Sequence, residues 1–259
     1  MKKILFSFIV LIFAFAGIAS ASLNIRDGFV QLKIKPGETF KGALIVENVT
    51  EQPLAVSMDF ADTMKDGVIV QRACSNWIDI PEKSFVISPL SLKRIEYAVT
   101  VPGTSEGGYW TALVYSYGMG NMEGPGGMNF NIGMKIEQGI MVKVIGTLKP
   151  SFEAQGFAVT YEGNSLNVHS TLLNIGNTPT RITPIMEILN EKKKLLLSNK
   201  MDTVGSYPDQ THRFNYTKDI KLKDGKYFAR LTVRYEEAGK FFTVTKKFIV
   251  SKSKPKKKK

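Results

Sequence analysis

The sequence predicts an all-β protein, with two tandem immunoglobulin-like β-sandwich domains after a cleaved signal peptide. Apolar and polar residues alternate with a period of two over most of the chain after residue 28, as in strands with one buried face. Turns rich in Gly, Pro and Asn separate these stretches, which is typical of sandwiches and barrels. Three blocks of sequence also occur twice in the same order, and this indicates two copies of one domain.

The first 21 residues have the features of a secretory signal peptide. Lys2 and Lys3 precede an apolar run from Ile4 to Ala16, and Ala19-Ser20-Ala21 offers small residues for cleavage. The run is shorter than the about 20 residues of a membrane-spanning helix, and a retained anchor is the alternative. We therefore expect an exported mature chain, located in the periplasm, secreted or on the cell surface.

The first domain is expected over residues 22–149. Its early strands are predicted by alternation at residues 29–34, 40–49, 54–60 and 92–101. A further strand follows the Gly107-Gly108 pair and begins at Tyr109, whose ring we expect to have an architectural role. Residues 118–131 are rich in glycine and methionine and lack periodicity, so they are predicted to form a long mobile loop.

The second domain is expected over residues 150–251, because its sequence repeats that of the first. The paired blocks are "GALIVENVTEQPLAVSM" (42–58) with "VHSTLLNIGNTPTRITPIMEI" (168–188), "PLSLKRIEYAV" (89–99) with "PDQTHRFNYTK" (208–218), and "GGYWTALVY" (107–115) with "GKYFARLTVRY" (225–235). Tyr227 is expected to share the architectural role of Tyr109. Residues 190–194 are charged and are predicted to form a hairpin turn rather than part of a helix.

The net charge of +12 belongs largely to the two ends of the chain. Lys2 and Lys3 lie in the signal peptide, and six lysines lie in the tail 252–259, which should be disordered. A nucleic-acid-binding protein would instead carry its basic residues on a folded face between aromatics. We therefore exclude nucleic acid as a partner. The tail either stays solvated, which is favoured, or contacts an anionic polymer of the cell envelope.

No motif for catalysis, a metal or a cofactor is present. The spacing of His, Cys and acidic residues matches no metal-binding pattern, and no base accompanies a nucleophile. Asp59, Asp62 and Asp66 lack the spacing of a Ca²⁺ loop, so we interpret them as solvated turn acids. The single cysteine, Cys74, is expected to be a buried structural thiol. These observations predict a non-enzymatic protein without a cofactor.

The stretch "IGMKIEQGIMVKV" (132–144) is a long strand with one strongly apolar side. The apolar residues of one parity, interrupted only by Gln138, are Ile132, Met134, Ile136, Ile140, Val142 and Val144. One interpretation is that this strand completes the first sandwich and faces its core. The other is that it extends beyond a usual strand of about five or six residues and pairs with the strand of a partner. Both interpretations remain open on sequence alone.

These features together resemble the periplasmic pilus chaperones. The shared features are the signal peptide, the two Ig-like sandwiches, the long stretch before the last strand of the first sandwich, and the alternating apolar residues in that strand. The resemblance implies that residues 132–144 are donated to an exported pilus subunit. It also implies a basic pair that holds the subunit's terminal carboxylate, for which Arg26 and Lys143 are the candidates.

A second resemblance is to the WxL-interacting cell-surface proteins. It rests on "LKIKPGETFKGALIVENVTEQPLAV", "SNWIDIPEKSFVISPLSLKRIEYAVTVP", "GGYWTALV" and "LKDGKYFARLTV". Members usually end in a transmembrane helix and a basic tail, of which this sequence has the tail. This resemblance implies an alternative function, a cell-envelope scaffold or adhesin module that binds surface proteins or peptidoglycan through its sheet faces.

Overall fold

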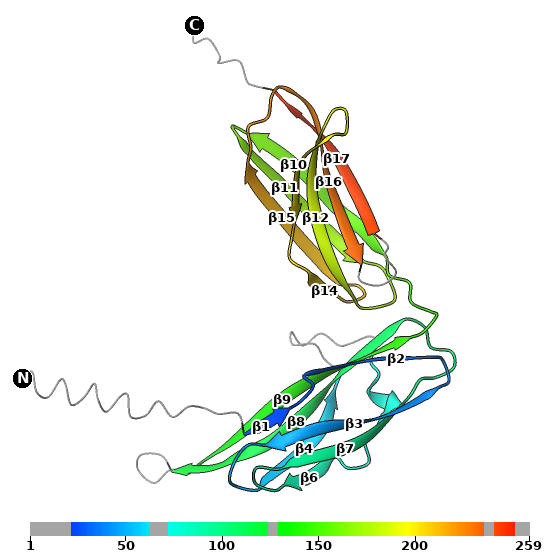
Figure 1. Cartoon of the computed structure of the whole chain (residues 1–259), viewed down its shortest axis with the longest axis vertical. Helices are drawn as coiled ribbons and strands as arrows, with labels where there is room; N and C mark the ends of the chain where they lie inside the picture. The colour runs from blue at the N-terminus through cyan, green and yellow to red at the C-terminus, as the bar shows by residue number, and fades with distance from the viewer. Residues whose placement is uncertain (1–21, 63–71, 124–128, 236–240, 252–259) are drawn as a thin grey trace, which may run out of the picture. The chain divides into compact units, whose positions relative to one another are not determined.

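The computed structural model describes residues 22–62, 72–123, 129–235 and 241–251. The predicted signal peptide (1–21), the predicted Lys-rich tail (252–259) and Asp66 lie outside these residues. The described chain is almost entirely β-structure, which confirms the predicted fold class (Figure 1). Its one helical element among the described residues is a 3₁₀ turn, η1 (Ser75–Trp77). No described helix is long and apolar enough to cross a membrane.

The N-terminal sandwich consists of strands β1 to β9, arranged in two sheets. The strands are β1 (Leu23–Ile25), β2 (Phe29–Ile34), β3 (Thr39–Asn48), β4 (Leu54–Ala61), β5 (Ile78–Asp79), β6 (Ser84–Ile87), β7 (Leu92–Thr100), β8 (Gly108–Glu123) and β9 (Asn129–Val144). One sheet has the order β1-β3-β7-β5, and the other has the order β2-β9-β8-β4-β6.

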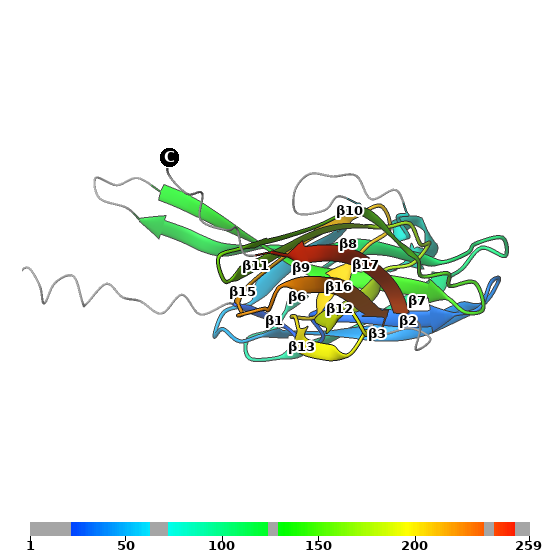
Figure 2. The ribbon, with the colours of Figure 1, turned by 90° about the horizontal axis from the view of Figure 1, so that it is seen from above.

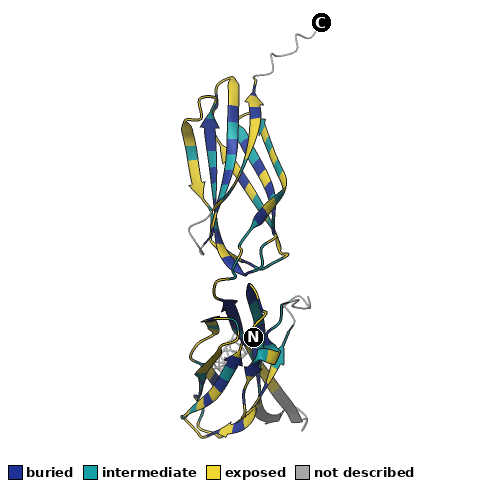
Figure 3. Ribbon diagram, turned by 90° about the vertical axis from the view of Figure 1, so that its right-hand side faces the viewer, coloured by how far each residue is buried: buried dark blue, intermediate teal, exposed yellow. Residues whose placement is uncertain are grey.

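Each of these strands buries one of its two faces, as the sequence alternation predicts. In β4, Leu54, Val56 and Met58 are buried, whereas the residues between them are exposed. Figure 3 shows buried and exposed residues alternating along the strands. In β3 and β7 the same alternation buries Val46 and Ile95. The buried faces of the two sheets form the core of the N-terminal sandwich.

The C-terminal sandwich consists of strands β10 to β17. The strands are β10 (Phe152–Glu162), β11 (Ser165–Asn174), β12 (Thr180–Asn190), β13 (Leu195–Lys200), β14 (Val204–Ser206), β15 (Thr211–Asp219), β16 (Gly225–Tyr235) and β17 (Phe241–Val250). The sheet orders are β10-β11-β15 and β13-β12-β16-β17, with β14 paired to β12. One buried cluster, which includes Val168, Leu172, Ile188 and Leu231, joins the two sheets. The predicted turn at residues 190–194 is confirmed, because it connects β12 to β13.

The repeated sequence blocks fold into equivalent strands. In the N-terminal sandwich, β3 pairs with β7 and β8 pairs with β4, whereas in the C-terminal sandwich β11 pairs with β15 and β16 pairs with β12. The order β9-β8-β4-β6 therefore matches β17-β16-β12-β13. This correspondence confirms that one sandwich topology occurs twice in the chain.

Matching asparagines support the turns that follow β3 and β11. Asn48 is fully buried, and its Nδ2 donates to the carbonyl oxygens of Gln52 (2.7 Å), Ile87 (3.1 Å) and Ser88 (3.1 Å). Asn174 is also fully buried and donates to the carbonyl oxygen of Ser206 (3.3 Å). These bonds satisfy backbone acceptors that would otherwise be buried without a partner.

The predicted long loop at 118–131 is wrong for most of its length. β8 continues to Glu123 and β9 already begins at Asn129, so only residues 124–128 lie outside the described strands. The hairpin that β8 and β9 form runs out beyond the ends of the neighbouring strands (Figures 1 and 2). The glycines hide this structure in the sequence, because strand formation here follows from pairing with the neighbouring strand rather than from intrinsic propensity.

The described chain divides into two compact units. The first contains residues up to 31, 39–100 and 110–141, and the second contains residues 32–38, 101–109 and from 142 onward. The sheet that contains β2 and β9 has residues in both units. The domain limits 22–149 and 150–251 therefore stay a proposal made from the sequence repeat.

Candidate functional site

Strand β9 lies between β8 and β2, but β2 covers only one end of it. β2 has six residues and β9 has sixteen. At one end of the contact the Phe29 ring lies against Gly139, where an added Cβ would come within 2.7 Å of it. At the other end the N–H of Ile145 donates to the carbonyl oxygen of Ile34 (2.9 Å). β2 therefore runs parallel to β9 and covers it from about residue 139 onward.

The other end of β9, residues 129–138, has a bare edge on the side away from β8. None of the described strands pairs with it there, because β1 belongs to the other sheet. We call this segment the free edge. An edge of this kind presents unpaired N–H and C=O groups that can accept another strand.

The direction of the backbone N–H groups follows from two bonds at the end of β9. The N–H of Val144 donates to Gly107, on the β8 side, at 2.9 Å, whereas that of Ile145 donates to Ile34, on the β2 side. Because consecutive residues of a strand alternate, the even-numbered amides of β9 face β8. The odd-numbered amides, including those of Gly133, Lys135 and Glu137, face outward along the free edge.

The predicted strand residues divide into a buried group and an accessible group. Ile140, Val142 and Val144 are at most 1% exposed and pack in the core. Met134 is 38% exposed and Ile136 is half-buried, both on the free edge. Ile132 also belongs to β9, but its side chain lies outside the described part of the structure.

Gln138 separates these two groups. It is 1% exposed, although it interrupts an apolar pattern. Its Oε1 accepts a hydrogen bond from the hydroxyl of Tyr115 (2.7 Å), and its Nε2 donates to the carbonyl oxygen of Asp27, just before β2. The side chain therefore ties β9 to β8 and to the start of β2, at the residue where the free edge ends.

The two residues implied as carboxylate anchors lie in different environments. Arg26 is exposed and follows β1, and its backbone N–H donates to the carbonyl oxygen of Ile45 (3.2 Å). Lys143 lies near the end of β9 and is only 4% exposed. Their joint role is not evident from these positions, so it stays a prediction from the resemblance.

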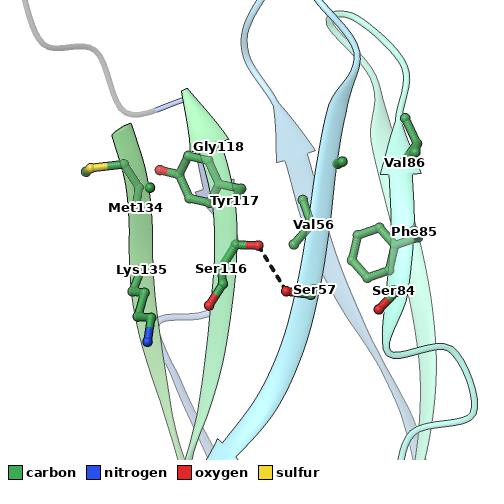
Figure 4. Close-up of a pocket in the computed structure, with 12 residues that line it drawn as sticks. Val56, Ser57, Ser84, Phe85, Val86, Ser116, Tyr117, Gly118, Met134 and Lys135 are labelled. Atoms are coloured by element: carbon green, nitrogen blue, oxygen red, sulfur yellow. Dashed lines mark hydrogen bonds between the residues drawn. The ribbon is translucent and has the colours of Figure 1, made fainter. Parts of the chain in front are cut away.

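A groove of about 940 Å³ adjoins the free edge. It is lined by three consecutive residues from each of four neighbouring strands, namely 55–57 of β4, 84–86 of β6, 116–118 of β8 and 133–135 of β9 (Figure 4). Its walls combine apolar groups, such as Phe85 and the 63% exposed Val86, with small residues such as Ser116 and Gly118. Sequence reasoning missed this groove because its strands are distant from one another in the chain.

The acidic residue Asp62 has a structural role, which differs from the prediction of a solvated turn acid. Its carboxylate accepts hydrogen bonds from the hydroxyls of Thr111 (2.6 Å) and Ser75 (2.5 Å). The neighbouring Cys74 is fully buried, as predicted. Burial raises the pKa of the Cys74 thiol to about 12, and the negative charge of Asp62 adds to this rise.

The described residues contain no cluster of three or more His, Cys, Asp or Glu side chains that could hold a metal ion. His169 instead bonds through Nδ1 to Oδ1 of Asn215 (2.9 Å), and the ring of His212 stacks on that of Phe214. The predicted architectural role of Tyr227 is confirmed, because its hydroxyl donates to the carbonyl oxygen of Lys223 (2.9 Å). The polar groups of His169 and Tyr227 thus form hydrogen bonds within the C-terminal sandwich.

The sequence was compared with protein-family models and with curated proteins. No protein-family model matches it, and no curated protein is significantly similar to it.

Comparison of the fold with solved structures finds similar chains among pilus chaperones and their complexes. A chain of the chaperone–tip adhesin complex of CFA/I fimbriae matches with a TM-score of 0.50 at 9% identity, over 87% of this chain and 99% of that chain. The class 5 fimbriae chaperone CfaA matches with a TM-score of 0.46 at 10% identity, over 86% and 98% of the two chains. The Salmonella enterica SafA pilin–SafB chaperone complex contributes a match with a TM-score of 0.44 at 10% identity, over 90% and 99%. The chain thus has the fold of the pilus chaperones, two Ig-like β-sandwiches in tandem.

Proposed function

We propose that this protein is a non-enzymatic extracytoplasmic binding protein that captures an extended segment of an exported partner by β-strand addition. The partner strand pairs with the free edge of β9, which is the accessible half of the predicted strand 132–144. The observation that carries the proposal is the mismatch between β9 and β2, which leaves residues 129–138 without a strand on one side.

The chemistry of the free edge supports strand addition. Its odd-numbered amides supply main-chain donors, and Met134 and Ile136 supply apolar anchors on one face. Each anchor that is fully buried by a partner contributes about 1.5–3 kcal/mol before ordering costs. Ile140, Val142 and Val144 stabilise the sandwich, and we assign them no direct contact with the partner.

The class of partner follows by analogy of fold alone. The CFA/I complex joins a chaperone to a tip adhesin, and we propose an exported pilus or adhesin subunit as the partner here. Arg26, which is exposed, is the better placed of the two candidate carboxylate anchors. The location that this function requires is the periplasm or the cell surface, in agreement with the predicted signal peptide.

Amide hydrogen exchange on the purified mature protein tests whether the free edge is available. We expect fast exchange at Gly133, Lys135 and Glu137, whose N–H groups face outward, and slow exchange at Met134 and Ile136, whose N–H groups face β8. Residues 140–144 should be protected at every amide. Uniform protection of 133–137 would contradict the proposal for the free monomer, and the cell-envelope scaffold that binds through its sheet faces would then become the leading function.

A matched pair of proline substitutions tests whether the edge is used. Lys135→Pro removes an outward N–H, so we expect it to abolish binding of strand peptides to the free edge with little change in Tm. Ile136→Pro removes an N–H that faces β8, so we expect it to lower Tm because it breaks the hairpin ladder. Equal peptide binding by the wild type and Lys135→Pro would show that binding does not use this edge.

A further inference from the structure

Tyr117 carries a buried hydroxyl group for which the described residues supply no hydrogen-bond partner. The residue is 4% exposed and lies on the inner face of β8. Tyr115, two residues earlier on the same face, is buried as completely, but its hydroxyl is bonded to Gln138. A buried hydroxyl without a partner is uncommon and costs stability, so Tyr117 requires an explanation that Tyr115 does not.

The position of Tyr117 supplies that explanation. Its side chain forms part of the wall of the groove beside the free edge, and Figure 4 shows the phenol ring extending from β8 toward Met134 on β9. Met134 is 38% exposed and unbranched, so its side chain can rotate and open the hydroxyl to the groove. Gly133, next to Met134, leaves open space, because an added Cβ there would meet no atom within 4 Å.

We propose that the Tyr117 hydroxyl is a recognition group for the strand that the free edge captures. It forms a hydrogen bond with a Ser, Thr or Asn side chain that the partner strand places in the groove among its apolar residues. A phenol can donate or accept this bond. This inference rests on the proposed function, and it adds a specificity rule: a strand with only apolar residues at the groove-facing positions binds more weakly than one with a hydroxyl or amide at the correct position.

A set of synthetic peptides tests the rule. The peptides are about ten residues long, to match the free edge, and valine alternates in them with lysine or glutamate. In each member of the set one valine is replaced by threonine, which has nearly the same shape and carries a hydroxyl in place of one methyl group. Affinities for the wild type, Tyr117→Phe and Tyr115→Phe are measured by fluorescence anisotropy, and Tm is measured for each free protein.

We expect one threonine position to bind the wild type about tenfold more tightly than the all-valine peptide. Tyr117→Phe should remove this preference, keep the affinity for the all-valine peptide, and leave Tm unchanged or raised. Tyr115→Phe should lower Tm, because Gln138 loses its partner, and should keep the preference for threonine.

Two results would overturn the inference while leaving strand capture intact. One is a preference for threonine that persists in Tyr117→Phe. The other is a lower Tm for Tyr117→Phe, which would mean that the hydroxyl already has a partner. If no peptide binds even the wild type, strand capture itself fails, and the role of Tyr117 fails with it.

Discussion

At the scale of single residues, the buried polar groups of the N-terminal sandwich serve different purposes. Asn48 and Gln138 are buried and make hydrogen bonds to backbone carbonyl groups, so each holds two segments of chain together. The Asp62 carboxylate accepts hydrogen bonds from two hydroxyl groups and stabilises the chain near Cys74. Tyr117 differs from all of these, since its hydroxyl has no described partner. What supports a binding role for Tyr117 is the combination of this unpartnered hydroxyl with its position in the wall of the groove.

The Cys74 thiol makes the free energy of unfolding depend on pH in the alkaline range. Its pKa is about 12 in the folded protein, against an ordinary value of 9.0. Between these values the folded state holds a proton that the unfolded state has released, so the free energy of unfolding falls as pH rises, by up to about 1.4 kcal/mol per pH unit. Below pH 9 this contribution is complete.

Urea unfolding at about pH 8 and about pH 10.5 measures this effect. Cys74→Ser should show a smaller fall in stability between the two values than the wild type. For each protein the quantity compared is the change in the free energy of unfolding between the two pH values, because the substitution also changes the packing and so the absolute stability. An equal change in the two proteins would show that the thiol does not titrate as its burial requires.

For single residues, burial was predicted from the sequence more successfully than side-chain hydrogen bonds were. Burial of Cys74 was predicted from the residue type, because an unpaired cysteine is more often a buried structural thiol than a reactive one. Asp62 was misinterpreted because its two hydroxyl donors, Thr111 and Ser75, come from other parts of the chain. Contacts between residues that are distant in sequence have no local pattern that reveals them.

At the scale of elements, β9 is one strand with two structurally different halves. Its C-terminal half is covered by β2 and buries Ile140, Val142 and Val144, whereas its N-terminal half has a bare edge. The predicted alternatives of core strand and donor strand are therefore compatible, because each describes one half. The length of β2 determines where the covered half of β9 ends and the free edge begins, and Gln138 lies at this boundary.

Removing the Gln138 side-chain amide should loosen this junction. Gln138→Leu leaves the Tyr115 hydroxyl and the Asp27 carbonyl oxygen without their partner, so we expect a loss of about 2–4 kcal/mol in the free energy of unfolding. Met134→Ala, at an exposed position of the same face, should cost less than about 1 kcal/mol. Urea unfolding of both variants gives the comparison, and a Gln138→Leu protein as stable as the wild type would exclude a structural role for the amide.

The extent of β8 and β9 could not be predicted from local sequence. Residues 118–131 contain five glycines, which weaken any strand pattern. The strands form there because each supplies hydrogen-bond partners for the other across a hairpin. The position of β2 beside β9 was equally hidden, since about 100 residues separate Phe29 from Asn129 and pairing at that distance depends on the whole fold.

At the scale of the whole molecule, one topology is used twice with different additions. The paired strands and the supporting asparagines recur in both sandwiches. The long hairpin does not: β16 ends at Tyr235 and has eleven residues, against sixteen for β8. The sequence revealed the duplication because blocks of strand and turn residues match in order, whereas the strand order of each copy came from the structure.

The two sandwiches should respond separately to core substitutions. Leu172 is fully buried in the C-terminal sandwich, so Leu172→Ala should cost about 2–5 kcal/mol there. Both tryptophans, Trp77 and Trp110, lie in the N-terminal compact unit. In Leu172→Ala we therefore expect the thermal transition monitored by circular dichroism to shift to lower temperature. The transition monitored by tryptophan fluorescence should keep its midpoint.

A shift of the fluorescence transition in Leu172→Ala would show that the two sandwiches unfold as one cooperative unit. Val46→Ala provides the reciprocal control. Val46 is fully buried in β3 of the N-terminal sandwich, so its substitution should move the fluorescence transition.

The bare edge of β9 also has a consequence for the amount of protein that a cell can make. An edge that accepts one strand can accept others, and unpaired edges are common starting points for aggregation. The exposed charges of Lys135 and Glu137 discourage indiscriminate pairing but leave the main-chain groups open. Production of this protein should therefore be matched to that of the strand partner that we propose, and an excess made without that partner should accumulate as insoluble material.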